Sequence, residues 1–152
     1  MSVRLYGEEL RTSLAIAQPM VCNRDQTLHG VRLHLIRIGS VSGSVFVGFY
    51  NDSGTLLKTS SSRLISTIGT PPGDCFQFVP FDLDVICAAG ERYWVKLGCS
   101  SYTFSESAHV AWVYEYEFGA NKYCTRTIFG PNDAPLDVEM WETKLITKGT
   151  YP

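Results

Sequence analysis

Apolar and polar residues alternate along most of the chain, and glycine, proline, asparagine, aspartate and serine interrupt the alternation at roughly every 8–15 residues. Successive side chains of a β-strand point to opposite faces, so this period of two predicts strands. The predicted strands are residues 14–22, 28–38, 44–50, 55–59, 75–85, 92–99, 108–118, 122–129 and 136–147. No stretch has the periodicity of an amphipathic helix. About eight or nine short strands predict an all-β fold, an antiparallel, jelly-roll-like β-sandwich, with a closed barrel as the alternative.

One long strand, residues 28–38, carries a change of phase. Val31, Leu33 and Leu35 share one face, but at residues 36–38 the apolar positions shift by one. A period-two pattern that slips by one residue requires an extra residue in the strand. The slip therefore predicts a bulge, or a bend at a sheet corner.

The next segments predict a central strand, a hairpin and an edge strand. Residues 44–50 are apolar on both faces, which is typical of a strand covered on both sides. Residues 51–54 form the clearest hairpin loop, because Gly54 can take a positive φ. Pro80 has no backbone N–H to donate, so its strand belongs at a sheet edge or at a bulge.

The chain length of 152 residues fits a single domain. We expect residues 14–118 to form the β-sandwich. Residues 1–13 are then an N-terminal arm, and residues 119–152 are a C-terminal extension packed on the sandwich. No internal repeat or linker divides the chain.

Charged residues make up only 18% of the chain, and the formal net charge is −2. No positive potential of domain size is available to bind nucleic acid, so we expect no nucleic-acid partner. The apolar runs are far shorter than the roughly 20 residues that span a bilayer, and no secretory signal is visible. We therefore expect no membrane partner and assembly in the cytoplasm. The low charge density indicates either a surface covered by partners or two apolar layers.

Five cysteines are spread along the chain without a Cys-x-x-Cys pair, which argues against zinc ribbons and thioredoxin-like chemistry. An odd number leaves at least one thiol unpaired within the chain. Most fit the pattern of small buried hydrophobic residues in strands. The alternative is a disulfide between subunits, for which Cys22 and Cys124 are the candidates.

Catalytic chemistry has little support in the sequence. His29 lies at a predicted turn, His34 on the polar face of a strand, and His109 at the start of a strand. None stands beside a nucleophile-elbow pattern, and all three are expected at the surface. We therefore predict no enzyme and no cofactor, with a jelly-roll enzyme as a remaining alternative.

Metal binding and sugar binding are the other site chemistries considered. No metal site is predicted, although Asp52, Asp133 and Asp137 could contribute to a calcium site. Aromatic residues make up 12% of the chain and mostly suit core packing. Four lie in or near predicted loops and are candidates for partner contact or for sugar stacking: Tyr102, Phe104, Tyr123 and Trp141.

The order of several motifs adds a resemblance. These motifs are residues 16–20, 28, 31–35, 39, 43, 45–54, 78–81, 89–90, 93–95 and 110–112. The set resembles carbohydrate-binding-module-like β-sandwich domains, which occur in phage tail and capsid-associated proteins and in bacterial surface proteins. It covers about residues 14–118 and includes no catalytic signature.

This resemblance implies two functions. The lack of a visible signal sequence or neighbouring domain, together with residues 119–152, favours a non-enzymatic structural protein of a bacteriophage virion. Such a protein would decorate the capsid, neck or tail as a homo- or hetero-oligomer with other virion proteins, using residues 1–12 and 123–152 for docking. The alternative is a carbohydrate-binding module that attaches to a cell-surface glycan.

Overall fold

The computed structural model describes residues 4–11, 14–70, 78–116, 122–124, 126–129, 138–140 and 144–147. These residues form thirteen strands and one short 3-10 turn, so the predicted all-β class is confirmed. The strands are β1 (Arg4–Glu9), β2 (Leu14–Cys22), β3 (Gln26–Ile38), β4 (Ser44–Asn51), β5 (Leu56–Thr59), β6 (Arg63–Leu64), β7 (Phe78–Cys87), β8 (Arg92–Ser100), β9 (His109–Tyr116), β10 (Lys122–Cys124), β11 (Arg126–Phe129), β12 (Val138–Met140) and β13 (Lys144–Thr147). The turn η1 (Ile65–Thr67) follows β6.

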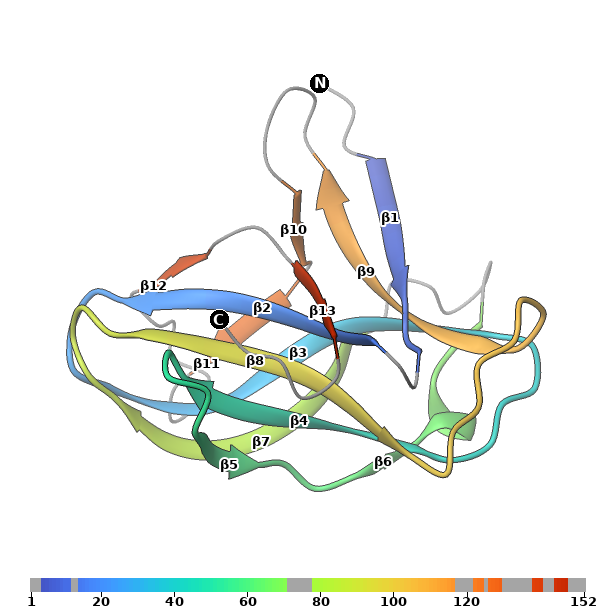
Figure 1. Cartoon of the computed structure of the whole chain (residues 1–152), viewed down its shortest axis with the longest axis horizontal. Coiled ribbons are helices and arrows are strands. Elements are labelled where there is room, and N and C mark those ends of the chain that lie inside the picture. The colour runs from blue at the N-terminus through green and yellow to red at the C-terminus, as the bar shows by residue number, and fades with distance from the viewer. Residues whose placement is uncertain are drawn as a thin grey trace.

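Two antiparallel sheets pack face to face as a sandwich (Figure 1). In the first sheet, β3 pairs with β7 on one side and with β9 and β11 on the other. In the second sheet the order is β2, β8, β4 and then β5, and β6 also pairs with β4. The short strands β12 and β13 both pair with β2. Sequence-distant segments thus form every sheet.

The core lies between the sheets and is built from the inward positions of each alternating strand. Val31, Leu33 and Leu35 of β3 are buried, as their shared face predicts. Their largest buried partners from other strands are Phe49, Phe81 and Trp112, together with Ile16, Met20 and Leu83. Each large apolar side chain removed from water contributes about 1.5–3 kcal/mol, so this layer supplies the main favourable term of folding.

The irregularity of β3 lies at a different place from the phase shift in the sequence. The register with β7 shifts between Leu28 and Gly30, where β7 carries the extra residue and Asp84 takes a φ of 51°. At residues 35–38, β3 pairs with β9, and this pairing has no register shift. The phase shift at residues 36–38 therefore marks the place where β3 passes from its pairing with β7 and β11 to its pairing with β9, and no bulge occurs there.

The hairpin and the edge strand have the predicted character. The Gly54 N–H donates to the Asn51 carbonyl at 3.1 Å, and the Asn51 side chain accepts the Thr55 N–H at 2.8 Å. Gly54 takes a φ of 87°, which a residue with a Cβ adopts only with strain. Pro80 lies exposed in β7, which pairs only with β3 among the described strands.

A ribbon of strands extends beyond the sandwich (Figure 1). The first half of β9 pairs with β3, while its second half pairs with β10 on that side and with β1 on the other. The β1–β9 register runs from Arg4 opposite Tyr116 to Glu9 opposite Ala111. Most of the region predicted as an N-terminal arm therefore forms a strand of the first sheet.

Candidate functional site

Two neighbouring strands of the second sheet present aromatic and charged residues on their outer face. The β4–β8 register places Tyr50 opposite Trp94, Gly48 opposite Lys96, and Phe46 opposite Gly98. Because Val45, Val47 and Phe49 point into the core, Phe46 and Tyr50 point outward. Trp94 lies on the same side of the sheet but is buried, with only 1% of its surface exposed. We name Phe46, Tyr50, Asp52, Arg92 and Lys96 the β4–β8 outer face.

Two glycines let the rings of this face lie against the sheet. A Cβ added at Gly98 would lie 2.6 Å from two ring carbons of Phe46. A Cβ at Gly48 would lie 2.8 Å from a ring carbon of Tyr50. These distances are shorter than van der Waals contact, so only a residue without a side chain permits this approach. Phe46 and Tyr50 are thus half-buried while keeping part of each ring exposed.

An acidic side chain fixes one end of the outer face. The Asp52 Oδ1 accepts hydrogen bonds from the Arg92 Nε at 2.5 Å and from the Trp94 Nε1 at 3.2 Å. The hydrogen bond from Arg92 holds the pKa of the Asp52 carboxyl below its usual value, and the Trp94 bond acts in the same direction. Asp52 therefore serves as an anionic anchor that joins the β4–β5 hairpin to β8.

Two cations lie close to aromatic rings on the same face. The Arg92 guanidinium carbon is 5.5 Å from the centre of the Trp94 ring, and the Lys96 Nζ is 5.8 Å from the centre of the Tyr50 ring. In such contacts the electron-rich face of the ring attracts the positive charge. The Trp94 ring is buried, so the partly exposed rings of this face are those of Phe46 and Tyr50. Such rings beside charged donors suit a polar ligand with an apolar face, such as a sugar, or a protein side chain.

The contacts of Asp52 do not support the calcium hypothesis. The one described candidate, Asp52, is occupied by Arg92 and Trp94. Across the part of the chain that the structure describes, no group of three potential metal ligands occurs. Asp133 and Asp137 lie outside the described residues.

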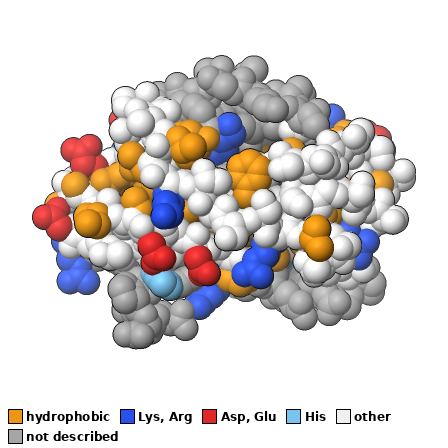
Figure 2. All heavy atoms as spheres, turned by 90° about the horizontal axis from the view of Figure 1, so that it is seen from below, with side chains coloured by type: hydrophobic (Ala, Val, Ile, Leu, Met, Phe, Trp, Pro, Cys, Tyr) orange, Lys and Arg blue, Asp and Glu red, His pale blue; other side chains and the backbone are white. Residues whose placement is uncertain are grey.

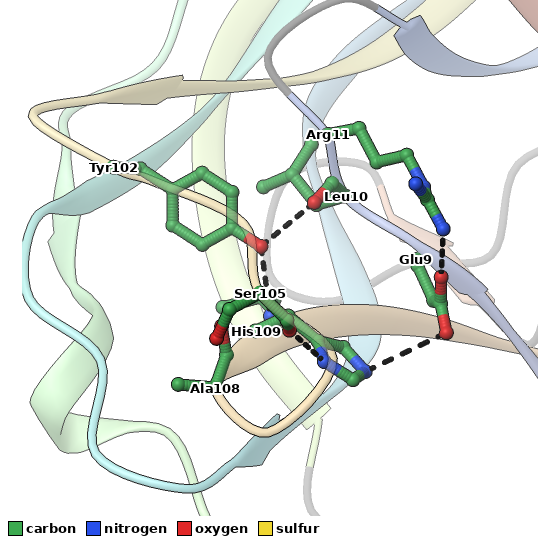
Figure 3. Close-up of polar contacts among 8 residues, drawn as sticks. Glu9, Leu10, Arg11, Tyr102, Ser105, Ala108 and His109 are labelled. Atoms are coloured by element: carbon green, nitrogen blue, oxygen red, sulfur yellow. Dashed lines mark hydrogen bonds and ion pairs between the residues drawn. The ribbon is translucent and has the colours of Figure 1, made fainter.

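Tyr102, one of the four aromatic candidates, belongs to the core and is only 6% exposed. Its hydroxyl donates to the Leu10 carbonyl at 2.7 Å and accepts the Val110 N–H at 3.1 Å (Figure 3). Burial raises the pKa of this hydroxyl, so it stays protonated as the first bond requires. Tyr102 thus links the residue after β1 to β9, which is a packing role.

Phe104 lies nearer the surface, in a cluster of polar contacts beside Tyr102. The Arg11 guanidinium carbon lies 4.0 Å from the centre of the Phe104 ring, and the His109 ring lies 5.2 Å from it. Arg11 also pairs with Glu9 at 2.6 Å (Figure 3). The Phe104 face is therefore occupied by side chains of this chain. We name Glu9, Leu10, Arg11, Tyr102, Phe104 and His109 the β1 junction.

Two histidines lie in the interior instead of at the surface, which corrects the sequence interpretation. His34 is 2% exposed and His109 is 8% exposed. The Nδ1 of His109 lies 2.9 Å from the Ser105 carbonyl, and because a carbonyl only accepts, this nitrogen carries the proton. Glu9 lies 3.9 Å from the other ring nitrogen. The partners of His109 are thus contributed by a loop and by β1, and sequence alternation could not reveal them.

The remaining candidates are in or next to the short C-terminal strands. Tyr123 and Cys124 belong to β10, whose backbone pairs with β9, and their side chains are outside the described part. Trp141 also lies outside the described residues. Cys22 is fully buried, and its thiol is hydrogen-bonded to Cys87. An interior position does not favour the alternative of a disulfide between Cys22 and Cys124 of two subunits.

Phe46 and Tyr50 were missed as surface residues. Residues 44–50 are apolar on both faces, and that pattern predicted a strand covered on both sides. The available signals were Gly48, two residues before Tyr50 in the same strand, and Gly98, which lies opposite Phe46 in the neighbouring strand. The placement of Gly98 could not be read from the sequence without the strand register.

Comparison with known proteins gives no match, neither to a protein-family model nor to a curated protein sequence. Among the described residues, none forms a helix with the length and hydropathy needed to cross a bilayer.

Proposed function

We propose that this chain is a non-enzymatic structural component of a bacteriophage particle, acting through contacts with other virion proteins in the capsid, neck or tail. The resemblance of residues 14–118 to phage-associated sandwich domains supports the setting. The distribution of exposed apolar residues supports the mode of action.

The observation that carries the proposal is a set of exposed apolar side chains on three strands of the sandwich. The exposed large hydrophobic residues of the described chain are Leu56 (50%), Leu57 (39%), Leu64 (62%) and Ile86 (78%). They belong to β5, β6 and β7, and β5 lies in contact with β7. Figure 2 views this side from below and shows hydrophobic side chains among charged ones. We name these four residues the β5–β7 flank.

Open strand edges on this flank add a second means of contact. In the described part of the chain, β5 and β6 pair only with β4, and β7 pairs only with β3. Unpaired edges offer backbone donors and acceptors to another chain, and proteins usually shield them with charges or proline. Asp82, Asp84 and Pro80 give β7 such shielding, whereas the flank leaves apolar side chains exposed. Exposed apolar residues beside open edges are a feature of protein interfaces.

A particle-incorporation experiment tests the proposal. The wild-type chain, the double variant Leu64→Lys/Ile86→Lys and the control Ser66→Lys are expressed during phage production. Purified particles are then analysed by quantitative mass spectrometry. We expect wild type and control at a fixed ratio to the major capsid or tail protein, and at least a tenfold loss for the double variant. Absence of the wild-type chain from particles overturns the proposal, and undiminished incorporation of the double variant removes the flank as the contact.

The β4–β8 outer face supports a second candidate, a carbohydrate-binding module. The half-buried rings of Phe46 and Tyr50, held against Gly98 and Gly48, resemble the flat stacking surfaces on which sugars bind. A glycan array probed with wild type, Phe46→Ala and Leu64→Ser tests it. We expect glycan signal that Phe46→Ala lowers at least tenfold and Leu64→Ser leaves unchanged. No glycan signal for the wild type overturns this candidate.

A further inference from the structure

Two thiols meet in the core at one end of the sandwich. Cys22 is the last residue of β2 and Cys87 is the last residue of β7. Both are fully buried, and their thiols are hydrogen-bonded to each other. Because β2 belongs to the second sheet and β7 to the first, this contact crosses the sandwich.

The backbone on both sides of this thiol pair is held in place. The Gly90 N–H donates to the Cys22 carbonyl at 2.7 Å, and the Cys22 N–H donates to the Glu91 carbonyl at 3.2 Å. The Asp25 carboxylate accepts the Ala89 N–H at 2.8 Å. The connection after β2 is thereby tied to the connection after β7, which keeps the two cysteines together.

A tyrosine completes the enclosure. The Tyr93 hydroxyl accepts the Ala88 N–H at 2.8 Å, and its ring stacks on Phe49 with centres 5.1 Å apart. Tyr93 is itself buried. The thiol pair is thus surrounded by groups of the core that are themselves held by hydrogen bonding and ring stacking.

We propose that Cys22 and Cys87 form a redox cross-link site, in which a small-molecule disulfide such as glutathione disulfide converts the two thiols into a disulfide that joins the two sheets. This site does not depend on the proposed virion or glycan function.

The reaction proceeds by two exchanges. One cysteine loses its proton, and its sulfur attacks the small disulfide, forming a mixed disulfide and releasing one small thiolate. The second cysteine loses its proton and attacks the protein sulfur of the mixed disulfide. The Cys22–Cys87 bond forms, and the second small thiolate leaves. Two electrons pass from the protein to the oxidant, and the two protons end on the released thiols.

Burial governs the rate of this reaction. Desolvation by burial raises the pKa of both thiols. The side-chain amide of Gln26 donates a hydrogen bond to the Cys22 sulfur and offsets part of this rise in pKa. Both thiols are shielded from solvent, so exchange follows opening of this end of the sandwich. Slow formation and slow reduction are the expected kinetics.

Chemical mapping of the wild-type chain is the primary test. The purified chain is incubated with excess glutathione disulfide, with and without a low urea concentration that promotes local opening. Free thiols are blocked, and the protein is digested with trypsin and chymotrypsin, because trypsin alone leaves Cys75 and Cys87 in one peptide. We expect a linked pair of peptides containing Cys22 and Cys87, with the intact mass lowered by two hydrogens. A Cys22 that remains free, or that links to another cysteine of the same or a second chain, overturns the proposal.

Thermal unfolding gives an independent readout. A cross-link between distant residues restricts the unfolded chain, so oxidation should raise the Tm by about 5–15 °C. The variants Cys22→Ala and Cys87→Ala should lose this rise, whatever their starting Tm. The control Cys99→Ala, which alters a half-buried thiol of β8, should keep it. A rise that persists in Cys22→Ala contradicts the proposal.

Discussion

The first sheet ends differently on its two sides. On the β9 side, β1 covers the edge, and the β1 junction fixes it through Tyr102, Arg11 and Glu9. On the β7 side, no further strand of the described chain pairs, and Ile86 is 78% exposed. Among the described strands, β1 closes one edge of the sheet, whereas the outer edge of β7 stays unpaired and carries the exposed Ile86 beside Pro80, Asp82 and Asp84. The difference indicates that the closed edge contributes stability and that the open edge is available for contact.

Among these changes, removal of the Tyr102 hydroxyl should lower the free energy of unfolding most. Tyr102→Phe leaves the Leu10 carbonyl and the Val110 N–H without their buried partner, which should cost about 1–3 kcal/mol. Tyr93→Phe, which loses one backbone partner, is the matched control and should cost about 0.5–1.5 kcal/mol. Urea unfolding measures both values, and hydrogen exchange should show faster exchange of β1 amides in Tyr102→Phe. Equal costs for the two variants would remove the special role of the junction.

The guanidinium of Arg11 should have a smaller effect. Arg11→Ala removes the contact with the Phe104 ring and the exposed pair with Glu9, which should cost about 0.5–1 kcal/mol. Arg63→Ala provides the comparison on the open edge, where Arg63 donates one exposed hydrogen bond to the Pro80 carbonyl. Its cost should be within about 0.5 kcal/mol. The same urea titrations show which variant loses more unfolding free energy. A larger loss for Arg63→Ala would mean that the β7 edge, and not the β1 edge, contributes more to stability.

The hairpin beside the open edge should respond weakly to pH. The pKa of Asp52 is lower in the folded chain than in the unfolded chain because Arg92 bonds its carboxylate. This stabilisation is present above the unfolded pKa of about 4 and is lost as pH falls through the folded pKa. Since Asp52 is substantially exposed, the loss should be under about 1 kcal/mol. Between about pH 7 and pH 3, the free energy of unfolding should fall less in Asp52→Asn than in the wild type. An equal fall in the two proteins would contradict this account.

Substitutions on the β5–β7 flank should have the smallest effect on stability. Leu64→Lys and Ile86→Lys change side chains that are mostly in water, so the free energy of unfolding should move by no more than about 0.5 kcal/mol. Thermal unfolding of each isolated variant measures this. A destabilisation above about 2 kcal/mol would mean that the flank packs within the folded chain, and the contrast between the two edges would fail.

Local features of the fold could be predicted from the sequence. Alternation identified the sandwich strands, the residues 51–54 identified a hairpin, and Pro80 identified an edge strand. Each of these features depends on residues that are close together along the chain, so the local sequence pattern was enough to predict it.

The site features depend instead on contacts between distant segments. The burial of His109 depends on Ser105 and on Glu9 of β1, and the contact between Cys22 and Cys87 depends on how two sheets meet. Neither contact leaves a periodic signal. The outward direction of Phe46 and Tyr50 was hidden for another reason, because apolar residues on both faces also describe a fully covered strand.

The shared strand β9 has a mechanical consequence. Its first half is held in the sandwich by β3, and its second half forms the centre of the ribbon with β1 and β10. A force applied at the tip of the ribbon is transmitted along one continuous backbone to the core residues Val110 and Trp112. A load along β1 is spread over its whole ladder with β9, from Arg4 to Glu9, before any single pair must break. The ribbon is therefore mechanically coupled to the sandwich through β9.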